Sequence, residues 1–168
     1  MVSLADLLPT FLELAGGTPP ETLDGRSFAD VLRGKRAEHR DRIFTTHSRD
    51  RDMNVYPIRS ARSRDWKYIR NLKPGAEHTT HIDKGNPASG RGYWTSWEER
   101  AKTDPAAAAV VERYHRRPAE ELYDLRTDPH ELKNLAADPA HAATLAGLRA
   151  DLDAWMKSQG DEGLASER

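Results

Sequence analysis

The chain has 168 residues, and its 26 basic and 27 acidic residues give a net charge of −1. No bulk positive field favours nucleic acid or an anionic membrane, and the absence of cysteine excludes disulfides, thiolate metal sites and a cysteine nucleophile. No apolar run approaches the roughly 18 residues that span a bilayer. Met1 leads directly into a helical pattern without a basic segment, so we expect no signal peptide.

An apolar helix is predicted within residues 3–16. Ser3 and Asp6 form a capping pattern, Gly16 is a stop signal, and Pro9 fits the first turn if the helix proper begins near Asp6. Its apolar face contains Leu4, Leu7, Leu8, Phe11, Leu12 and Ala15 at helical spacing. A short helix is predicted over 28–32, and the charged segment 35–42 is a candidate domain boundary.

Three strands are predicted in the middle of the chain. They cover residues 43–46, 56–62 and 66–71, and the last two form a hairpin around a polar turn at 63–65. A polar loop separates the first two strands. Residues 72–92 contain six glycines or prolines and no usable period, which suggests a long functional or partner-covering segment without regular structure.

Two helices with Asp-Pro caps are predicted in the second half. Asp104-Pro105 begins one that runs to about His115, after another helix that starts near Tyr93. Asp138-Pro139 begins the last helix, which ends at Gly160. Its apolar stripe consists of Leu145, Leu148, Leu152, Trp155 and Met156.

The segment 117–136 predicts a strand, a turn and a capped helical turn. Residues 120–125 alternate as a short strand does, and Asp128 with Glu131 matches a capping box around Pro129. The predicted fold class is therefore α+β. A small antiparallel sheet of about four strands is packed by the C-terminal helix on one face.

Several motifs, in order, resemble the C-terminal third of sulfatases. They are Val2-Ser-Leu-Ala-Asp-Leu-Leu-Pro-Thr-Phe-Leu-Glu-Leu-Ala-Gly16, Leu23-Asp-Gly-Arg-Ser27, Tyr56-Pro-Ile-Arg59, Trp66-Lys-Tyr-Ile-Arg-Asn71, Glu121-Leu-Tyr-Asp-Leu125, Asp128-Pro-His-Glu131 and Asn134-Leu-Ala136. The likeness is strongest to enzymes of the heparan N-sulfatase (N-sulfoglucosamine sulfohydrolase) type. It covers nearly the whole chain and is weakest over 72–117.

The resemblance implies hydrolysis of sulfate esters or sulfamates by a formylglycine, which is made from the Cys or Ser of a Cys/Ser-x-Pro-x-Arg motif. It also implies a calcium ion that is held by Asp and Asn side chains, and both groups belong to a large N-terminal α/β domain. Here the only Pro-x-Arg spacing follows Val55, which cannot become an aldehyde. We therefore expect no catalytic residue, no metal site and no cofactor in this chain, and no activity from it alone.

The resemblance also predicts the domain organisation. Residues 1–36 would be the end of the missing catalytic domain, and residues 37–168 the C-terminal subdomain. Without the rest of that domain, the first helix would expose apolar side chains and cause self-association or poor solubility. These side chains are Leu7, Leu8, Phe11 and Leu12. Sulfatases of this type are often periplasmic, secreted or lysosomal, which leaves the compartment of this chain open.

Four residues are candidates for substrate binding. In the resembling enzymes the loop that holds His47, Arg49 and Asp50 faces the active-site cleft, and an Arg offers a fork for sulfate or carboxylate. The alternative for this loop is a solvated segment of mixed charge. For Arg59 we favour a structural ion pair under the sheet over a substrate contact.

The other polar or aromatic clusters have plainer interpretations. His78, His81 and Asp83 lack the defined ligand set of a metal site. The aromatic residues of 90–97 either stack on sugar rings or pack in a core or interface. The carboxylates of Asp128 and Glu131 are explained by capping.

Two hypotheses follow for the function. In the first, the chain is the C-terminal part of a sulfatase, whose partners are an N-terminal sulfatase domain and, through the complete enzyme, a sulfated carbohydrate. In the second, it is a free-standing module that binds a sulfated sugar or a partner chain. Neither hypothesis involves nucleic acid or a membrane.

Overall fold

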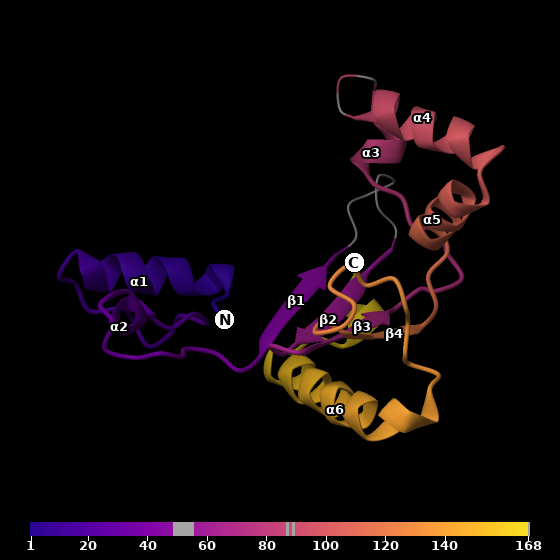
Figure 1. Ribbon diagram of the computed structural model, residues 1–168. Helices are drawn as coiled ribbons and strands as arrows, with labels where there is room; N and C mark the ends of the chain where they lie inside the picture. The colour runs from indigo at the N-terminus through magenta and orange to yellow at the C-terminus, as the bar shows by residue number, and fades with distance from the viewer. Residues whose placement is uncertain (49–55, 87, 89, 168) are drawn as a thin grey trace.

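A computed structural model describes residues 1–48, 56–86, 88 and 90–167 (Figure 1). The α-helices are α1 Leu7–Leu14, α2 Ala29–Leu32, α3 His81–Lys84, α4 Arg91–Ala101, α5 Pro105–His115 and α6 Ala142–Ser158. The strands are β1 Ile43–His47, β2 Ile58–Arg62, β3 Trp66–Asn71 and β4 Glu120–Asp124. Short 3-10 helices cover Leu4–Asp6, Pro139–His141 and Gly163–Ser166. Within the described residues, none of the helices is both long and apolar enough to cross a membrane.

The four strands form one antiparallel sheet in the order β1-β2-β3-β4, which confirms the predicted fold class. The predicted hairpin is present between β2 and β3. Its turn is closed by Ser63, whose N–H donates to the Trp66 carbonyl at 2.8 Å and whose Oγ accepts from the Trp66 N–H at 3.0 Å. All strand neighbours in this sheet are also neighbours in sequence, although 48 residues separate the end of β3 from the start of β4.

Helix α6 covers one face of the sheet, below the strands in Figure 1. Ala61, Tyr68 and Leu122 lie side by side across β2, β3 and β4, because Ala61 pairs with Tyr68 and Tyr68 pairs with Leu122. The predicted stripe of α6 packs on them as one buried cluster that includes Leu145, Leu148, Leu152 and Met156. Trp155 stacks on Phe44 of β1 with 5.2 Å between ring centroids.

The predicted capped turn of helix after β4 is wrong. Glu131 adopts a left-handed backbone conformation with φ of 56°, and Asp128 accepts from the N–H of Lys133 at 2.8 Å, two residues beyond the predicted capping position. The Glu131 carboxylate instead binds Lys67 Nζ on β3 at 2.7 Å. The Glu131 side chain therefore forms an ion pair with a distant strand, and not the local backbone hydrogen bond that the capping pattern predicted. The Asp138 cap is confirmed, since Asp138 accepts from the Ala140 N–H at 2.9 Å.

The expectation of no regular structure over 72–92 is wrong in part. Helix α3 occupies 81–84, and α4 begins at Arg91. A capping box forms α3, because Thr80 Oγ1 accepts from the Ile82 N–H and the Asp83 carboxylate accepts from the Thr80 N–H. One helical turn is too short to produce a visible apolar period, so the pattern alone did not reveal it.

Helices α1 and α2 and the connector up to Arg40 form an N-terminal lobe that is held together by Asp6. This fully buried carboxylate accepts from the backbone N–H groups of Ser3 and Arg26 and is paired with the guanidinium of Arg40. Gly25 is required beside it, because a Cβ there would lie 1.8 Å from the Ala5 carbonyl oxygen. The lobe is therefore fixed from the inside by a charge network and close backbone packing.

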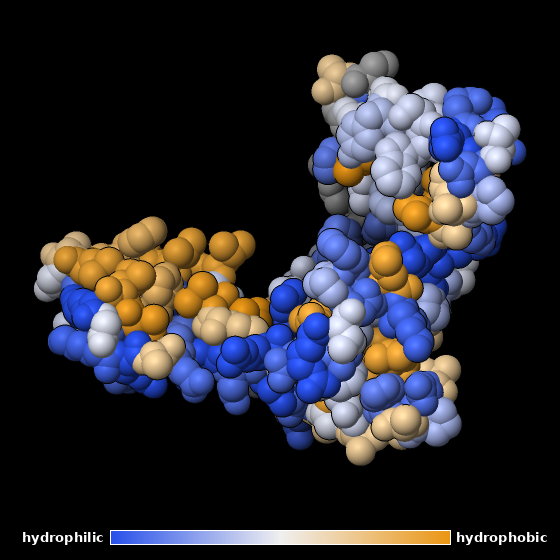
Figure 2. Space-filling model, in the orientation of Figure 1, coloured by the Kyte–Doolittle hydropathy of each residue, from blue (hydrophilic) through white to orange (hydrophobic). Residues whose placement is uncertain are grey.

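The outer side of this lobe is apolar and exposed (Figure 2). Leu8 and Phe11 of α1 are 54% and 60% exposed, as the sequence predicted, whereas Leu7 and Leu12 are half-buried. Other exposed apolar side chains of the lobe are Val2, Leu4, Leu14 and Leu32. In Figure 2 hydrophobic residues cover the side of the lobe on which Figure 1 places α1. The prediction of self-association stays a prediction.

The buried cluster between α6 and the sheet predicts a large effect of one substitution. Leu152→Ala removes a fully buried side chain and should lower the free energy of unfolding by about 2–5 kcal/mol, through lost apolar burial and the remaining cavity. Urea unfolding measures this difference. The control Leu132→Ala changes an exposed leucine and should have an effect within about 0.5 kcal/mol. Equal effects of the two substitutions would contradict the assignment of this core.

Candidate cleft edge

The end of β1 carries the first predicted substrate-binding residue. His47 is exposed there, and its ring lies 6.4 Å from the ring of His78. Arg49 and Asp50, the other two candidates in this loop, lie outside the described residues. We call His47, His78, Tyr56 and Tyr114 the β1 corner. The sequence indicated His47 but considered His78 only as a metal ligand.

His78 is held in one orientation and one tautomer. Its Nδ1 lies 3.1 Å from the Tyr114 carbonyl oxygen, which can only accept, so Nδ1 carries the proton and Nε2 remains an acceptor. The rings of Tyr56 and Tyr114 pack edge-on against it at 5.4 and 4.9 Å. Burial lowers the pKa of His78 below its usual value, and the positive charge of Arg117 adds to this effect. The imidazole is therefore neutral at neutral pH.

A tight pairing of two segments builds this corner. The His78 N–H donates to the His115 carbonyl at 2.8 Å, and His115 Nδ1 lies 3.0 Å from the His78 carbonyl. Thr80 Oγ1 and the Tyr114 hydroxyl are 2.8 Å apart. The segment after β3 is thus fixed to the end of α5, although His78 and Tyr114 are 36 positions apart in the sequence.

A buried ion pair lies beneath the β1 corner. Arg117 donates from Nε and Nη2 to the Glu121 carboxylate at 2.9 and 3.0 Å, and its carbonyl accepts from the Tyr56 hydroxyl at 3.1 Å. Glu121 also accepts from Asn71 Nδ2 and the Tyr123 hydroxyl. Burial by itself would raise the pKa of Glu121, but these donors, with Arg117 foremost, hold the pKa below its usual value. Glu121 is therefore ionised and its oxygens are engaged.

Arg59 lies away from the β1 corner, on the α6 side of the sheet. It is only 3% exposed, and it donates to Asp161 at 2.5 Å and to Glu167 at 2.6 Å. Burial opposes its charge, but these two carboxylates raise the pKa of Arg59 above its usual value. The structural ion pair that the sequence favoured is present. A substrate contact by Arg59 stays a prediction.

The metal interpretation of His78, His81 and Asp83 gains no support from the geometry. Asp83 caps α3, and its other oxygen lies 3.7 Å from His115 Nδ1. In the part of the chain that the structure describes, no three His, Cys, Asp or Glu side chains are grouped to hold a metal ion. Within the β1 corner, Tyr56 and His78 are buried and the Tyr114 hydroxyl is bound to Thr80, so the exposed His47 is the group that can reach a polar ligand.

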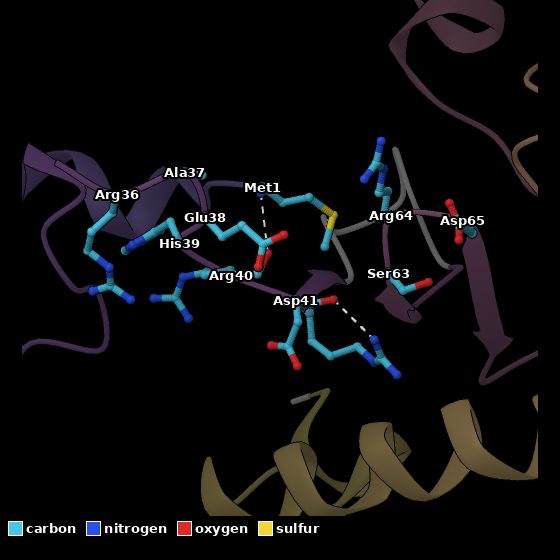
Figure 3. A pocket seen from close by; sticks show the side chains of 11 residues that line it. Met1, Arg36, Ala37, Glu38, His39, Arg40, Asp41, Ser63, Arg64 and Asp65 are labelled. Carbon is cyan, nitrogen blue, oxygen red and sulfur yellow. Dashed lines mark hydrogen bonds between the residues drawn. The ribbon is translucent and has the colours of Figure 1, made fainter. Parts of the chain in front are cut away.

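A cavity of about 850 Å³ lies between the connector 36–42 and the turn at 63–65. Figure 3 shows the connector side chains on one side of it and the turn on the other. Arg40 is engaged with Asp6, and Arg42 with Asp151 at 2.8 Å. The remaining lining charges are two arginines and three acids, namely Arg36, Arg64, Glu38, Asp41 and Asp65. Their near balance gives no preference for a charged ligand.

Comparison with known proteins identifies the family. No family model matches the chain. An ulvan-active sulfatase from Formosa agariphila is 33% identical over 163 residues, which are 96% of this chain and 30% of the relative. The human N-sulphoglucosamine sulphohydrolase is 29% identical over 92% of this chain and 32% of its own length. A solved 2-O GAG sulfatase superposes with a TM-score of 0.61 and 27% identity, over 94% of this chain and 25% of that structure.

The chain corresponds to the C-terminal portion of a sulfatase. It spans about a third or less of the length of these relatives. The likeness extends to the α+β fold, since a solved sulfatase structure superposes over 94% of this chain. The N-sulphoglucosamine sulphohydrolase that the motifs suggested is among the relatives, together with the ulvan-active enzyme.

The ion pair of this sulfatase portion predicts a pH-dependent stability. Glu121→Gln leaves the half-buried Arg117 without a countercharge and should cost about 1–3 kcal/mol at neutral pH, measured by urea unfolding. Because the folded-state pKa of Glu121 is lowered, its contribution is present above the usual glutamate pKa and is lost as the pH falls below it. The difference in free energy of unfolding between the wild type and the variant should therefore become smaller at acidic pH.

The chain contains a matched control for this substitution. Glu112 and Arg116 form a second ion pair at the same four-residue spacing, but both side chains are exposed. Glu112→Gln should change the free energy of unfolding by less than about 0.5 kcal/mol. An equal cost of the two substitutions, or a difference that does not depend on pH, would contradict the role of the buried pair.

Proposed function

We propose that this chain is the non-catalytic C-terminal part of a hydrolase that removes sulfuric ester or N-sulfate groups from sulfated sugars. The observation that carries the proposal is the coverage: sulfatases match almost the whole chain, but the chain spans only 25–32% of their length. The nucleophile motif is missing from the sequence, since Val55 stands at the position that a Cys or Ser would need. Formylglycine and calcium would come from the remaining segment of the complete enzyme.

The β1 corner supports a role at the edge of the substrate cleft. His47 is exposed at the end of a strand whose neighbours are fixed by packing, and the buried imidazole of His78 packs beside it. A strand end is a rigid position, which favours the precise placement of a ligand contact. In this proposal, His47 contacts the sugar together with Arg49 and Asp50, and Arg59 remains a further candidate.

The N-terminal lobe supports an assembly with the rest of such an enzyme. We assign residues 1–36 to the end of the catalytic domain and residues 37–168 to the C-terminal subdomain. The exposed apolar face of α1 would then pack on the catalytic domain, because a contiguous patch of this kind marks an interaction surface. The same face argues against a free-standing module, which would leave it in water.

The proposal predicts that the purified chain releases no sulfate. Incubation with a 4-nitrophenyl sulfate and with a sulfated glycosaminoglycan oligosaccharide should yield no sulfate above the buffer background, measured by ion chromatography. A His47→Ala variant provides a control, because its background must equal that of the wild type. Sulfate release by the wild-type chain would overturn the assignment of the chemistry to another segment.

The same preparation tests the alternative of a sugar-binding module with a separate measurement. Circular dichroism and light scattering first establish whether the chain is folded and monomeric. A soluble, well-folded monomer that binds sulfated oligosaccharides and has no tendency to self-associate would favour the free-standing module over the sulfatase part.

A further inference from the structure

Helix α4 carries a row of side chains that the β1 corner does not use. Tyr93, Ser96, Trp97 and Arg100 are three or four residues apart and therefore share one face of the helix. Tyr93 is 54% exposed and Trp97 44%. A cavity of about 290 Å³ lies against this row and is lined by Ser96, Trp97, Arg100 and Ala107, the last from α5.

Core packing explains only one of the three aromatic residues on α4. Trp94 is buried, and its ring lies 4.5 Å from Tyr114 and 5.7 Å from His115. Tyr93 and Trp97 lie outside this contact and remain in solvent. Of the aromatic residues that could either pack in a core or stack on a sugar, Trp94 packs between α4 and α5. Tyr93 and Trp97 remain accessible to a ligand.

Arg100, beside Trp97, is paired with Asp104 but keeps N–H donors for an anion. Arg100 uses Nε for Asp104 at 2.9 Å, and within the described residues neither of its terminal nitrogens donates to a protein acceptor. The two nearby glutamates of α4 already have partners. Glu98 pairs with Arg91 at 3.1 Å and Glu99 with Lys102 at 2.7 Å. The two terminal nitrogens of Arg100 can therefore donate hydrogen bonds to a ligand in the cavity.

We propose that this cavity binds an anionic pyranose. The apolar face of the sugar would stack on the Trp97 indole, and its carboxylate or sulfate group would accept from Arg100. Ser96 Oγ donates to the Tyr93 carbonyl at 2.6 Å, so it is left to accept from a sugar hydroxyl. This inference goes beyond the proposed function. It adds a glycan contact on α4, built without any β1-corner residue, and it does not depend on where the nucleophile lies.

The test uses the complete chain and three monosaccharide probes. Glucuronate and glucose 6-sulfate distinguish a carboxylate from a sulfate as the recognised anion, and neutral glucose measures stacking without charge. Titrations are followed by the ¹⁵N–¹H signals of the four tryptophan indoles, with a Trp97→Phe variant to assign the Trp97 signal. We expect at least one anionic sugar to shift the Trp97 indole selectively, and to bind about tenfold more tightly than glucose.

Two substitutions and one matched control distinguish specific binding at Trp97 and Arg100 from general electrostatic attraction to exposed arginines. Trp97→Ala should weaken binding of the anionic sugar about tenfold or more, and Arg100→Gln should bring its affinity down to that of glucose. Arg116→Gln removes another exposed arginine with a carboxylate partner four residues away and should change nothing.

Three results would overturn the proposal. The first is no indole shift with any probe up to tens of millimolar. The second is equal affinity for glucose and for both anionic sugars. The third is equal loss of binding in Arg100→Gln and Arg116→Gln. A Trp97 indole that shifts on addition of another protein segment, and with none of the sugars, would assign the surface to a protein partner instead.

Discussion

The buried ion pair between Arg117 and Glu121 holds this structure together at the point where distant segments meet. Glu121 lies on β4, accepts from Asn71 on β3 and binds the segment that leaves α5. Burying two charges is favourable only when their remaining donors and acceptors are satisfied, and here Asn71 and Tyr123 complete the carboxylate. The pair therefore fixes how the 48 residues between β3 and β4 return to the sheet.

The β1 corner depends on the position of the segment that leads back to the sheet at Arg117. The Arg117 carbonyl holds the Tyr56 hydroxyl, and Tyr56 packs on His78, which lies next to His47. On the other side of the sheet, α6 and the pair of Asp161 and Glu167 with Arg59 give a separate, apolar and ionic support. A rigid sheet thus presents one polar corner, while the N-terminal lobe presents an apolar face. An apolar face of this kind is typical of an interface with another protein segment.

Local signals in the sequence revealed most of the fold. The α6 stripe, the Asp104 and Asp138 caps and the hairpin at Ser63 each depend on neighbours within a few residues, and all are present. Glu131 misled the prediction because its side chain serves a distant partner, Lys67, instead of the local backbone. The sequence did not place His78 at the candidate site for the same reason. Its neighbours are His47 of β1, Tyr56 before β2 and Tyr114 of α5, and no local spacing encodes these contacts.

In the proposed assembly, α1 belongs to an interface whose other side is another sulfatase segment. Hydrogen–deuterium exchange of the dilute, monomeric chain tests it most directly. We expect the amides of α1 to exchange much faster than those of α6, because the apolar face of α1 is exposed while α6 is packed on the sheet. Equal protection of α1 and α6 in the monomer would contradict it.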